Sequence, residues 1–341
     1  MRYAVVGGPS SIRVDESEPP VPGPGDILVR MAACGICGSD LEKVYGSYGQ
    51  PSMRLGHEPA GTVLEVGGDV EGISPGDRVF THHHVPCYSC HLCRHGNETR
   101  CPEYSRSNLS PCGLAEEYLV PAWNVERGGV LKLPDSMTFE EAALIEPLAC
   151  CVRAWSKCRY ERGDSVAVFG VGSTGMMHAM LAAQYGFGGI YCVDVNRFRL
   201  DYATSLVDSD GVMADEHTAE TLRRKTDGRG VDLAVVATGS LGALQSAIDS
   251  VRYGGTVIMF GVPSKGATMP MDMDHMYSRE VTLTGSYAAS DLDTKSALEM
   301  VRDGTMDVGR LVTHRYGVAD AQRAFDHARS GSDAVKIIIT G

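Results

Sequence analysis

The chain has 341 residues, of which 43% are hydrophobic and 22% are charged, a balance typical of a soluble globular protein. This length exceeds one ordinary hydrophobic core, so two domains are expected. Lysine and arginine total 31 against 43 acidic residues, and the net charge of −12 argues against binding to a nucleic-acid backbone, which relies on clustered basic side chains.

The N-terminal residues contain no apolar run of signal-peptide length, and no membrane-spanning apolar stretch occurs in the sequence. We therefore expect a cytoplasmic protein with no membrane partner. The 11 cysteines would be unusual as a disulfide framework in a reducing compartment. Their odd number and C-x-x-C spacing indicate thiolate–metal chemistry instead.

The first 150 residues predict a β-rich unit, because short apolar stretches alternate with Gly and Pro. Strands are expected at 26–34, 61–68 and 76–80. Three histidines, His82, His83 and His84, follow the last of these. On a continuing strand, neighbouring side chains point to opposite faces, so we expect these histidines to pack or line a cleft and not to share one ion.

Four cysteines lie close together in CYSCHLCRHGNETRC, at Cys87, Cys90, Cys93 and Cys101. Zn²⁺ binds four thiolates tetrahedrally, and such a closed site has no position for a substrate. The surrounding residues are mostly polar, so metal binding must supply much of the local folding energy. Ferredoxin iron–sulfur spacings differ from this one. The segment therefore predicts a structural zinc lobe over about residues 86–103.

From about residue 163, continuous apolar strands alternate with helical segments, which predicts a parallel sheet covered on both faces. Strands are expected at 165–170, 190–194, 232–239, 256–261 and 281–287, and helices over 197–206 and 243–255. Periodicity leaves open whether the last 50 residues, including the apolar run 334–340, return to the first domain.

A dinucleotide site is predicted where the first of these strands ends, in GVGSTG (Gly170, Gly172, Ser173, Thr174, Gly175). The three glycines allow a tight turn, a close approach of the backbone to a pyrophosphate, and close helix–strand packing. The following helix N-terminus presents free N–H groups to the anion. Asp194 ends the next strand, 24 residues after Gly170, near the interval at which an acid binds the ribose hydroxyls.

Asp194 also predicts which cofactor is used. A carboxylate accepts a hydrogen bond from the ribose 2′-OH of NAD but repels the 2′-phosphate of NADP. Arg197 and Arg199 follow closely. They either weaken the repulsion of the NADP 2′-phosphate or form the solvated start of a helix. NAD is expected in preference to NADP.

Three further motifs are GICGSD (35–40), GHEPAGTVLEVG (56–67) and EPL (146–148). With the four-cysteine segment and GVGSTG, their order and intervals resemble the zinc-dependent medium-chain alcohol dehydrogenase/reductase family over essentially the whole chain. The resemblance implies an α/β protein with a GroES-like catalytic domain at 1–150, a Rossmann domain at 151–288, and a return to the catalytic domain at 289–341.

By this resemblance, Cys37, His57 and Glu146 are the catalytic zinc ligands, with water or a substrate oxygen in the fourth position. Glu58 resembles the adjacent acid that approaches the zinc during ligand exchange, and Asp40 resembles the carboxylate that orients His57. Taken singly, these residues are equally consistent with a buried thiol, a satisfied histidine and structural carboxylates. The Glu in EPL, where liver-type alcohol dehydrogenases have Cys, resembles the sorbitol and polyol dehydrogenase branch.

The resemblance implies reversible oxidation of a secondary hydroxyl of a polyol, sugar or cyclitol to a ketone, with hydride transfer to NAD. Zinc polarises the hydroxyl as a Lewis acid, and Ser39 begins the proton path. Glu42 stands where many relatives have a histidine of that path; it either binds a polyhydroxylated substrate or is an exposed charge. Tyr45 and Tyr48 either line the substrate cleft or pack in the core.

Other substrates on the same architecture stay open, namely aminocyclitols, threonine-type amino alcohols and simple secondary alcohols. The net charge of −12 and the lack of a basic stripe disfavour a zinc-ribbon module for nucleic acid. Cys37, His57 and Glu146 disfavour a zinc-free reductase. Two zinc ions per chain are expected, one catalytic and one structural. The family implies a homo-oligomer, a tetramer or dimer with a Rossmann-domain contact.

Overall fold

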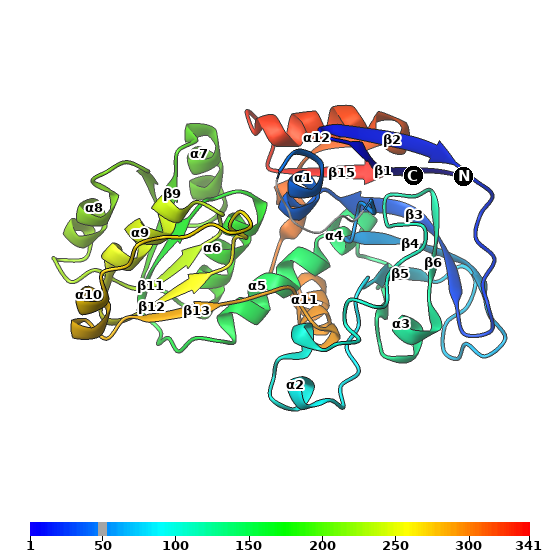
Figure 1. Cartoon of the computed structure of the whole chain (residues 1–341), viewed down its shortest axis with the longest axis horizontal. Coiled ribbons are helices and arrows are strands. Elements are labelled where there is room, and N and C mark those ends of the chain that lie inside the picture. Colours follow the sequence, from blue (N-terminus) through cyan, green and yellow to red (C-terminus); the bar gives the residue numbers. More distant parts are fainter. Residues whose placement is uncertain (47–52) are drawn as a thin grey trace. The chain divides into compact units, whose positions relative to one another are not determined.

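The chain divides into two compact units in the computed structural model, which describes residues 1–46 and 53–341 (Figure 1). Unit 1 comprises Met1–Ala149 and Ala288–Gly341, and unit 2 comprises Cys150–Tyr287. Unit 1 is therefore built from two separate stretches of chain, and the C-terminal residues left open by periodicity belong to it. Helix α5 (Ile145–Trp155) carries the chain from the first unit into the second.

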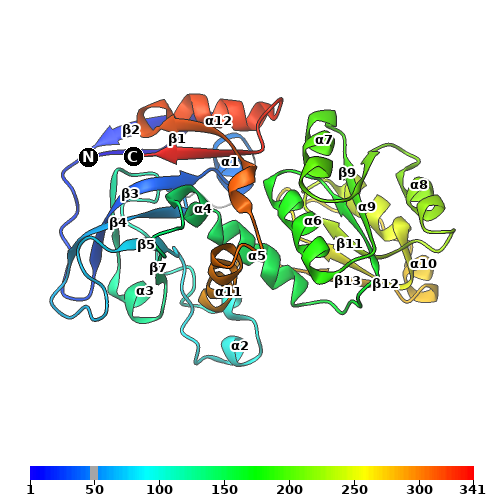
Figure 2. The same ribbon diagram turned by 180° about the vertical axis from the view of Figure 1, so that it is seen from behind.

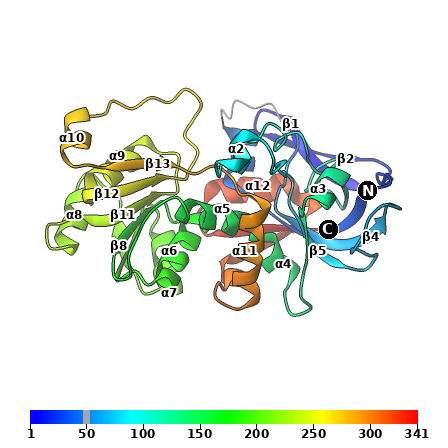
Figure 3. The same cartoon turned by 90° about the horizontal axis from the view of Figure 1, so that it is seen from below.

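Unit 2 is built on a sheet of six parallel strands in the order β10-β9-β8-β11-β12-β13. Its strands are β8 (Ser165–Phe169), β9 (Gly189–Asp194), β10 (Asp210–Met213), β11 (Val231–Val236), β12 (Val251–Met259) and β13 (Thr282–Gly285). Its helices are α6 (Ser173–Tyr185), α7 (Arg197–Leu206), α8 (Thr218–Lys225), α9 (Leu241–Ser250) and α10 (Met273–Ser278). Helices α6 and α7 cover one face and α9 the other (Figure 3). All residues of β8 and β11 are buried, as expected for a sheet covered on both faces.

Two elements of unit 2 differ from the sequence-based prediction. The helix expected over 243–255 ends at Ser250, and β12 begins at Val251. Val251 is β-branched and a glycine pair follows at 254–255, which lowers helix propensity there. Strand β10 was not predicted, because it has only four residues and one buried side chain.

The strands β8 and β11 lie side by side at the centre of the sheet of unit 2. Strands β9 and β10 are added outward on the β8 side, and β12 and β13 on the β11 side, so the direction in which strands are added reverses between β8 and β11. In open sheets of this kind, ligands bind outside the carboxyl ends of the strands at the reversal. The Gly-rich segment follows β8 and lies at this point.

Unit 1 contains a seven-stranded sheet in the order β14-β15-β3-β4-β5-β7, with β6 also paired to β3, and a separate β1–β2 hairpin. Only β14 and β15 pair in parallel; the remaining neighbours in this sheet are antiparallel. Its strands are β1 (Arg2–Gly8), β2 (Ser11–Glu16), β3 (Ile27–Gly35), β4 (Pro59–Val66), β5 (Arg78–Thr81), β6 (Glu117–Val120), β7 (Val130–Lys132), β14 (Val312–Gly317) and β15 (Lys336–Thr340).

The helices of unit 1 are short and lie around this sheet. They are α1 (Gly38–Tyr45), α2 (His91–Arg94), α3 (Ala122–Glu126), α4 (Phe139–Ala143), α11 (Asp291–Arg302) and α12 (Ala321–Ser330), with single turns at Glu98–Arg100, Val308–Leu311 and Val318–Asp320. Helix α12 packs along β15 and β2 (Figure 2) and buries Phe325 in the core that also contains Val29, Val63 and Ile339. The α/β fold class, with a β-rich unit and a parallel-sheet unit, is confirmed. In the described part of the chain, no helix combines the length and apolarity needed to cross a membrane.

Candidate metal and dinucleotide sites

Unit 1 brings together a thiol, an imidazole and a carboxylate from two separate motifs. Cys37 is the N-cap of α1, while His57 and Glu58 directly precede β4. Their ligand atoms all lie within 4.8 Å of one another. A mixed set of three such ligands is typical of zinc sites that keep one coordination position open for a substrate.

Glu58 provides the test of whether this set fits a metal ion. Its side chain is fully buried, and Oε1 has no hydrogen-bond partner among the described residues. Its Oε2 lies 2.5 Å from the Nζ atom of Lys336. A buried carboxylate oxygen without a partner costs several kcal/mol of desolvation. A cation bound between Cys37, His57 and Glu58 would supply the partner, so the residues fit zinc.

Asp40 lies behind His57 in the first turn of α1 and is fully buried. Its Oδ2 is 3.3 Å from His57 Nδ1, and its Oδ1 accepts hydrogen bonds from Lys43 Nζ at 3.0 Å and the Gly56 amide at 3.4 Å. Burial alone would raise the pKa of Asp40, but the charges of Lys43 and His57 hold it well below its usual range. The ionised carboxylate holds the Nδ1 side of His57, which leaves Nε2 for a metal.

Glu146 lies in the first turn of α5 and belongs to a different group from the one predicted. Its carboxylate lies within 4.8 Å of ring nitrogens of His82 and His83. The group around Cys37 and His57 contains Glu58 instead. Glu58 follows His57 directly in the chain, so the same turn that delivers the imidazole also delivers this carboxylate.

His82 and His83 converge with Glu146, which differs from the opposite faces expected for neighbouring histidines on a continuing strand; that the histidines share no ion stays a prediction. Strand β5 ends at Thr81, so the alternation of side chains stops before His82. The His83 ring also lies 5.1 Å from the His57 ring, centre to centre, which makes the two groups neighbours. His82 Nε2 and His83 Nδ1 are buried and have no hydrogen-bond partner in the described residues.

Two charged residues beside these groups were not identified from the sequence. Lys336 is 2% exposed on β15; its Nζ donates to the Ile36 carbonyl at 3.0 Å and faces Glu58. Burial lowers the pKa of Lys336, but the Glu58 carboxylate raises it overall, so the ammonium form is retained. Asp291 is buried at the start of α11, 2.9 Å from His82 Nδ1. A lone lysine within the apolar run AVKIIIT was the available signal.

The remaining predicted residues near Cys37 lie on α1. Ser39 is half-buried in its first turn, and Glu42 is exposed on its surface. Tyr45 packs against the core and donates a hydrogen bond to Asp326 at 2.6 Å, so it takes the core-packing role. Tyr48 lies outside the described residues.

The four cysteines of the predicted zinc lobe converge, with their sulfur atoms within 4.8 Å of one another. The Sγ atoms of Cys90 and Cys93 lie 3.5 Å apart, and those of Cys87 and Cys101 lie equally far apart. Both distances are too long for a disulfide bond, which is about 2.05 Å. Amide groups donate to Cys87 and Cys101 at 3.3–3.4 Å. Hydrogen bonds from Ser89 lower the pKa of Cys87 to about 6, whereas burial raises the pKa of Cys93 to about 12. A bound cation would deprotonate all four thiols.

Two tyrosines attach this lobe to a distant part of unit 1. Tyr88 donates to Asp291 Oδ2 at 2.9 Å, and Tyr104 donates to the Ala289 carbonyl at 2.7 Å. Asp291 therefore binds both Tyr88 of the lobe and His82 next to Glu146. These hydrogen bonds anchor the lobe to the residues around the start of α11.

The Gly-rich turn of unit 2 has the geometry that a dinucleotide requires. Gly170 has φ of +85°, a left-handed conformation that favours glycine. A side chain at Gly175 would lie 2.0 Å from the Gly170 carbonyl oxygen, whereas one at Gly172 would enter open space. Gly172 caps α6 without a side-chain hydrogen bond, so the first amides of the helix, at Ser173 and Thr174, face that space. The turn fits a pyrophosphate group.

Asp194 ends β9 and is nearly fully buried. Its Oδ2 accepts from the Val171 amide and its Oδ1 from the Asn196 amide, both at 2.8 Å, so it also holds the Gly-rich turn in place. Arg197 pairs with Asp201 at 2.8 Å on the surface of α7. Arg199 is half-buried, and its Nε has no hydrogen-bond partner among the described residues.

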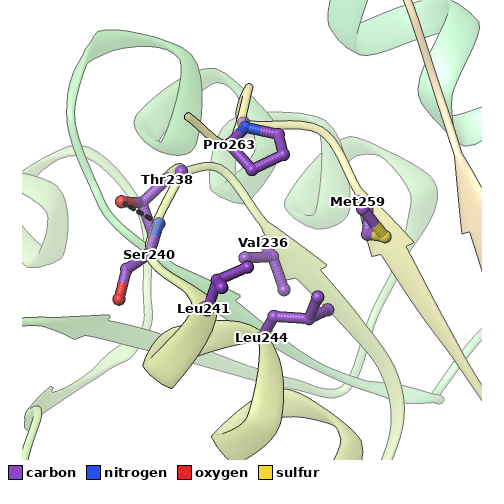
Figure 4. A pocket seen from close by; sticks show the side chains of 9 residues that line it. Val236, Thr238, Ser240, Leu241, Leu244, Met259 and Pro263 are labelled. Carbon is purple, nitrogen blue, oxygen red and sulfur yellow. Dashed lines mark hydrogen bonds between the residues drawn. The ribbon is translucent and has the colours of Figure 1, made fainter. Parts of the chain in front are cut away.

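A pocket opens at the carboxyl ends of β11 and β12, next to the reversal of strand order (Figure 4). It is lined mainly by backbone and small or apolar side chains: Val236, Thr238, Gly239, Ser240, Leu241, Leu244, Met259, Gly261 and Pro263. Gly170 lies against Thr238, which connects this pocket to the Gly-rich turn. It is a shallow, mostly apolar depression at the edge of the sheet where ligands of such folds bind.

Comparison with known proteins yields matches over both units. Residues 23–135 match the alcohol dehydrogenase GroES-like domain, and residues 173–303 match the zinc-binding dehydrogenase domain. Sorbitol dehydrogenase of Bacillus subtilis is 30% identical over 99% of this chain and 97% of its own. D-xylulose reductase A of Aspergillus niger is 31% identical over 96% and 92%. Alcohol dehydrogenase TADH from Thermus sp. ATN1 superimposes with a TM-score of 0.88 at 28% identity, covering 100% and 99%.

Proposed function

Because this chain belongs to the family of zinc-binding dehydrogenases with a GroES-like domain, we propose that it oxidises a secondary hydroxyl of a polyol, sugar or cyclitol to a ketone, reversibly, with NAD as hydride acceptor. The observation that carries this proposal is the group of Cys37, His57 and Glu58 with a buried, unpartnered carboxylate oxygen. The substrate class is supported by two relatives named for sorbitol and xylulose.

We propose two zinc ions per chain. Cys87, Cys90, Cys93 and Cys101 would hold the structural ion. Cys37 and His57 would hold the catalytic ion, with Glu58 as the carboxylate that geometry favours and Glu146 as the alternative in the adjoining group. When bound, the catalytic zinc supplies Lewis-acid polarisation of a hydroxyl, and NAD supplies the hydride acceptor.

The protein's own residues hold the reacting groups and move the proton. Asp40 fixes the orientation of His57, and Lys336 compensates the buried charge of Glu58. Ser39, two residues after Cys37, would accept a hydrogen bond from the substrate hydroxyl and relay the proton to solvent by giving up its own hydroxyl proton as it takes the substrate's. The buried nitrogens of His82 and His83 would bind further hydroxyl groups, since each lacks a partner in the described residues. These two histidine nitrogens suit a substrate with several hydroxyl groups better than a simple alcohol.

In unit 2, the turn from Gly170 to Gly175 would bind the cofactor pyrophosphate, and Asp194 the adenosine ribose. Arg199 would lie beside that ribose, where its Nε gains a partner. The carboxylate of Asp194 favours NAD over NADP by repelling a 2′-phosphate. We also propose a cytoplasmic homo-oligomer, a tetramer or dimer, which light scattering on the purified protein would test.

A substrate panel tests the proposed function directly. Polyols, sugars, cyclitols, aminocyclitols, threonine-type amino alcohols and simple secondary alcohols are each offered with NAD and with NADP, and reduced nicotinamide is followed by absorbance. We expect the highest kcat/KM for a polyol, sugar or cyclitol with NAD. Turnover of simple alcohols alone, or of no alcohol by the zinc-loaded enzyme, would contradict the proposal.

Replacing Asp194 by asparagine is expected to reduce the preference for NAD over NADP about 10-fold, measured as the ratio of the two kcat/KM values. Asparagine keeps one acceptor, for the Val171 amide, and removes the charge that repels a 2′-phosphate; its NH2 group then faces the Asn196 amide, so that hydrogen bond is lost. Asp215→Asn is the matched control, because Asp215 follows the neighbouring strand β10 and bonds only nearby residues. A ratio that stays unchanged in Asp194→Asn would remove Asp194 from the ribose site.

Replacing Glu42 by alanine separates its two interpretations. Its exposure on α1 favours a surface charge, and exposed substitutions shift free energies by less than about 0.5 kcal/mol. We therefore expect KM for a polyol and for a simple secondary alcohol to change by the same small factor, about twofold or less. A rise confined to the polyol would assign Glu42 to substrate binding.

A further inference from the structure

A third cluster of metal-ligating side chains lies in unit 1, formed by residues that the proposed reaction does not use. His314 is on β14, His327 is on α12, and Asp333 is in the turn between α12 and β15. Their ligand atoms lie within 4.8 Å of one another. The chain thus brings two imidazoles and one carboxylate to one point from three successive elements.

The second nitrogen of each imidazole is held by a hydroxyl group. Tyr316 OH lies 2.8 Å from His327 Nδ1, and Thr313 Oγ1 lies 3.0 Å from His314 Nδ1. Both contacts leave Nε2 directed toward Asp333. Partners of this kind on the far nitrogen orient and stabilise histidines that bind metals.

Hydrogen bonding alone explains only part of the arrangement. His327 Nε2 lies 2.7 Å from Asp333 Oδ1, a normal hydrogen bond. His314 Nε2 lies 4.0 Å from Asp333 Oδ2, too far for one, although the two histidine rings are only 4.3 Å apart, centre to centre. A cation between the three residues would join His314 to the group.

We propose that His314, His327 and Asp333 form a further binding site for a divalent transition metal such as Zn²⁺, separate from the two zinc sites of the proposed function. Two imidazoles and a carboxylate are ligands that suit Zn²⁺, with water completing the coordination. The side chains are 30%, 19% and 60% exposed, so the ion exchanges with solvent.

Occupancy of this site would tie three parts of unit 1 together. Asp333 lies three residues before β15, the strand that pairs with both β14 and β3. An ion bound by Asp333, His314 and His327 would therefore hold the turn before β15 in place next to β14 and α12. Because a metal that binds the folded chain shifts unfolding by mass action, Tm should rise with the concentration of free Zn²⁺.

The test uses the full zinc-loaded chain without a polyhistidine tag, titrated with Zn²⁺ by isothermal calorimetry. We expect one exchangeable Zn²⁺ per chain beyond the tightly held ions. Tyr316→Phe removes only the hydroxyl that holds His327 Nδ1, and it should weaken the affinity for this exchangeable Zn²⁺ about 10-fold. His314→Ala and Asp333→Asn each remove a ligand and should weaken it more than Tyr316→Phe does.

The matched control is His217→Ala, at the N-cap of α8. His217 is an exposed histidine beside Glu216 and Glu220, at 3.5 and 3.8 Å, in a group that does not converge. Its loss should leave the exchangeable Zn²⁺ and the rise in Tm unchanged. Absence of an exchangeable ion in the wild type, or wild-type affinity in both His314→Ala and Asp333→Asn, would overturn the proposal. Binding and Tm are read without turnover, so the result is independent of the proposed reaction.

Discussion

Replacing Cys37 by serine is expected to lower kcat/KM for the best alcohol substrate by about 10³-fold or more. Lewis-acid polarisation by a bound metal contributes several kcal/mol to the transition state, and each 1.36 kcal/mol corresponds to a factor of ten in rate. Cys37 is the only sulfur in its ligand group as the structure describes it. Zinc content, measured by atomic spectrometry, should fall by one ion per chain while the fold is retained.

Cys158→Ser provides the control for loss of a thiol. Cys158 is half-buried in unit 2, where its sulfur donates only to the Trp155 carbonyl, and its replacement should leave both zinc content and kcat/KM near wild type. Glu58→Gln and Glu146→Gln then compare the two carboxylates. We expect the larger loss of zinc from Glu58→Gln, because Glu58 shares the ligand group of Cys37 and His57. Full activity of Cys37→Ser at wild-type zinc content would refute the catalytic site.

Replacing Cys90 by serine is expected to destabilise unit 1 while each surviving folded molecule keeps its turnover. The lobe is held by four thiolates and few apolar contacts, so loss of its ion removes much of its folding energy. We expect the free energy of unfolding to fall by at least about 3 kcal/mol, or Tm by roughly 6–12 °C. Calorimetry, zinc content and limited proteolysis within residues 86–103 provide the measurements.

His91→Ala is the control within the same lobe. His91 is exposed on α2, next to Cys90, and its ring lies against that of His95. Its replacement should change neither zinc content nor Tm appreciably. If Cys90→Ser lost kcat in proportion to zinc while Tm stayed constant, the lobe would have to be assigned to catalysis instead of structure.

The architecture of unit 2 could be predicted from the sequence because its signals are local. Strands β8, β9 and β11 are mostly apolar and almost fully buried runs, and the Gly-rich turn follows the first of them directly. The edge strand β10 was missed, since only Val212 of its four residues is buried. The end of α9 was misplaced because the apolar pattern continues into β12, where pairing with β11 decides the conformation.

The candidate metal site was harder to predict because it depends on contacts between distant residues. Family resemblance gave Cys37, His57 and Glu146 as ligands and Glu58 as the adjacent acid. No local spacing relates these residues to Lys336, which lies 278 positions after Glu58. Asp291 joins His82 in the same way from α11. The convergence of His82 and His83 was not foreseen for a more local reason. Strand β5 ends at Thr81, close to the expected end at residue 80, so the alternation of a continuing strand does not apply to the histidines that follow.

Unit 1 is formed by two stretches of chain with unit 2 between them, and this affects the order in which the two units can fold during synthesis. Unit 2 is one continuous stretch that is complete when Tyr287 leaves the ribosome. Unit 1 lacks strand β15, which pairs with β14 and β3, until residues 336–340 have emerged, and its four-cysteine lobe lacks the anchor at Asp291 until α11 has been made. Residues 1–149 therefore stay incompletely folded, with β3 lacking its partner β15, while unit 2 folds. Exposure to aggregation and chaperone binding is concentrated in that interval.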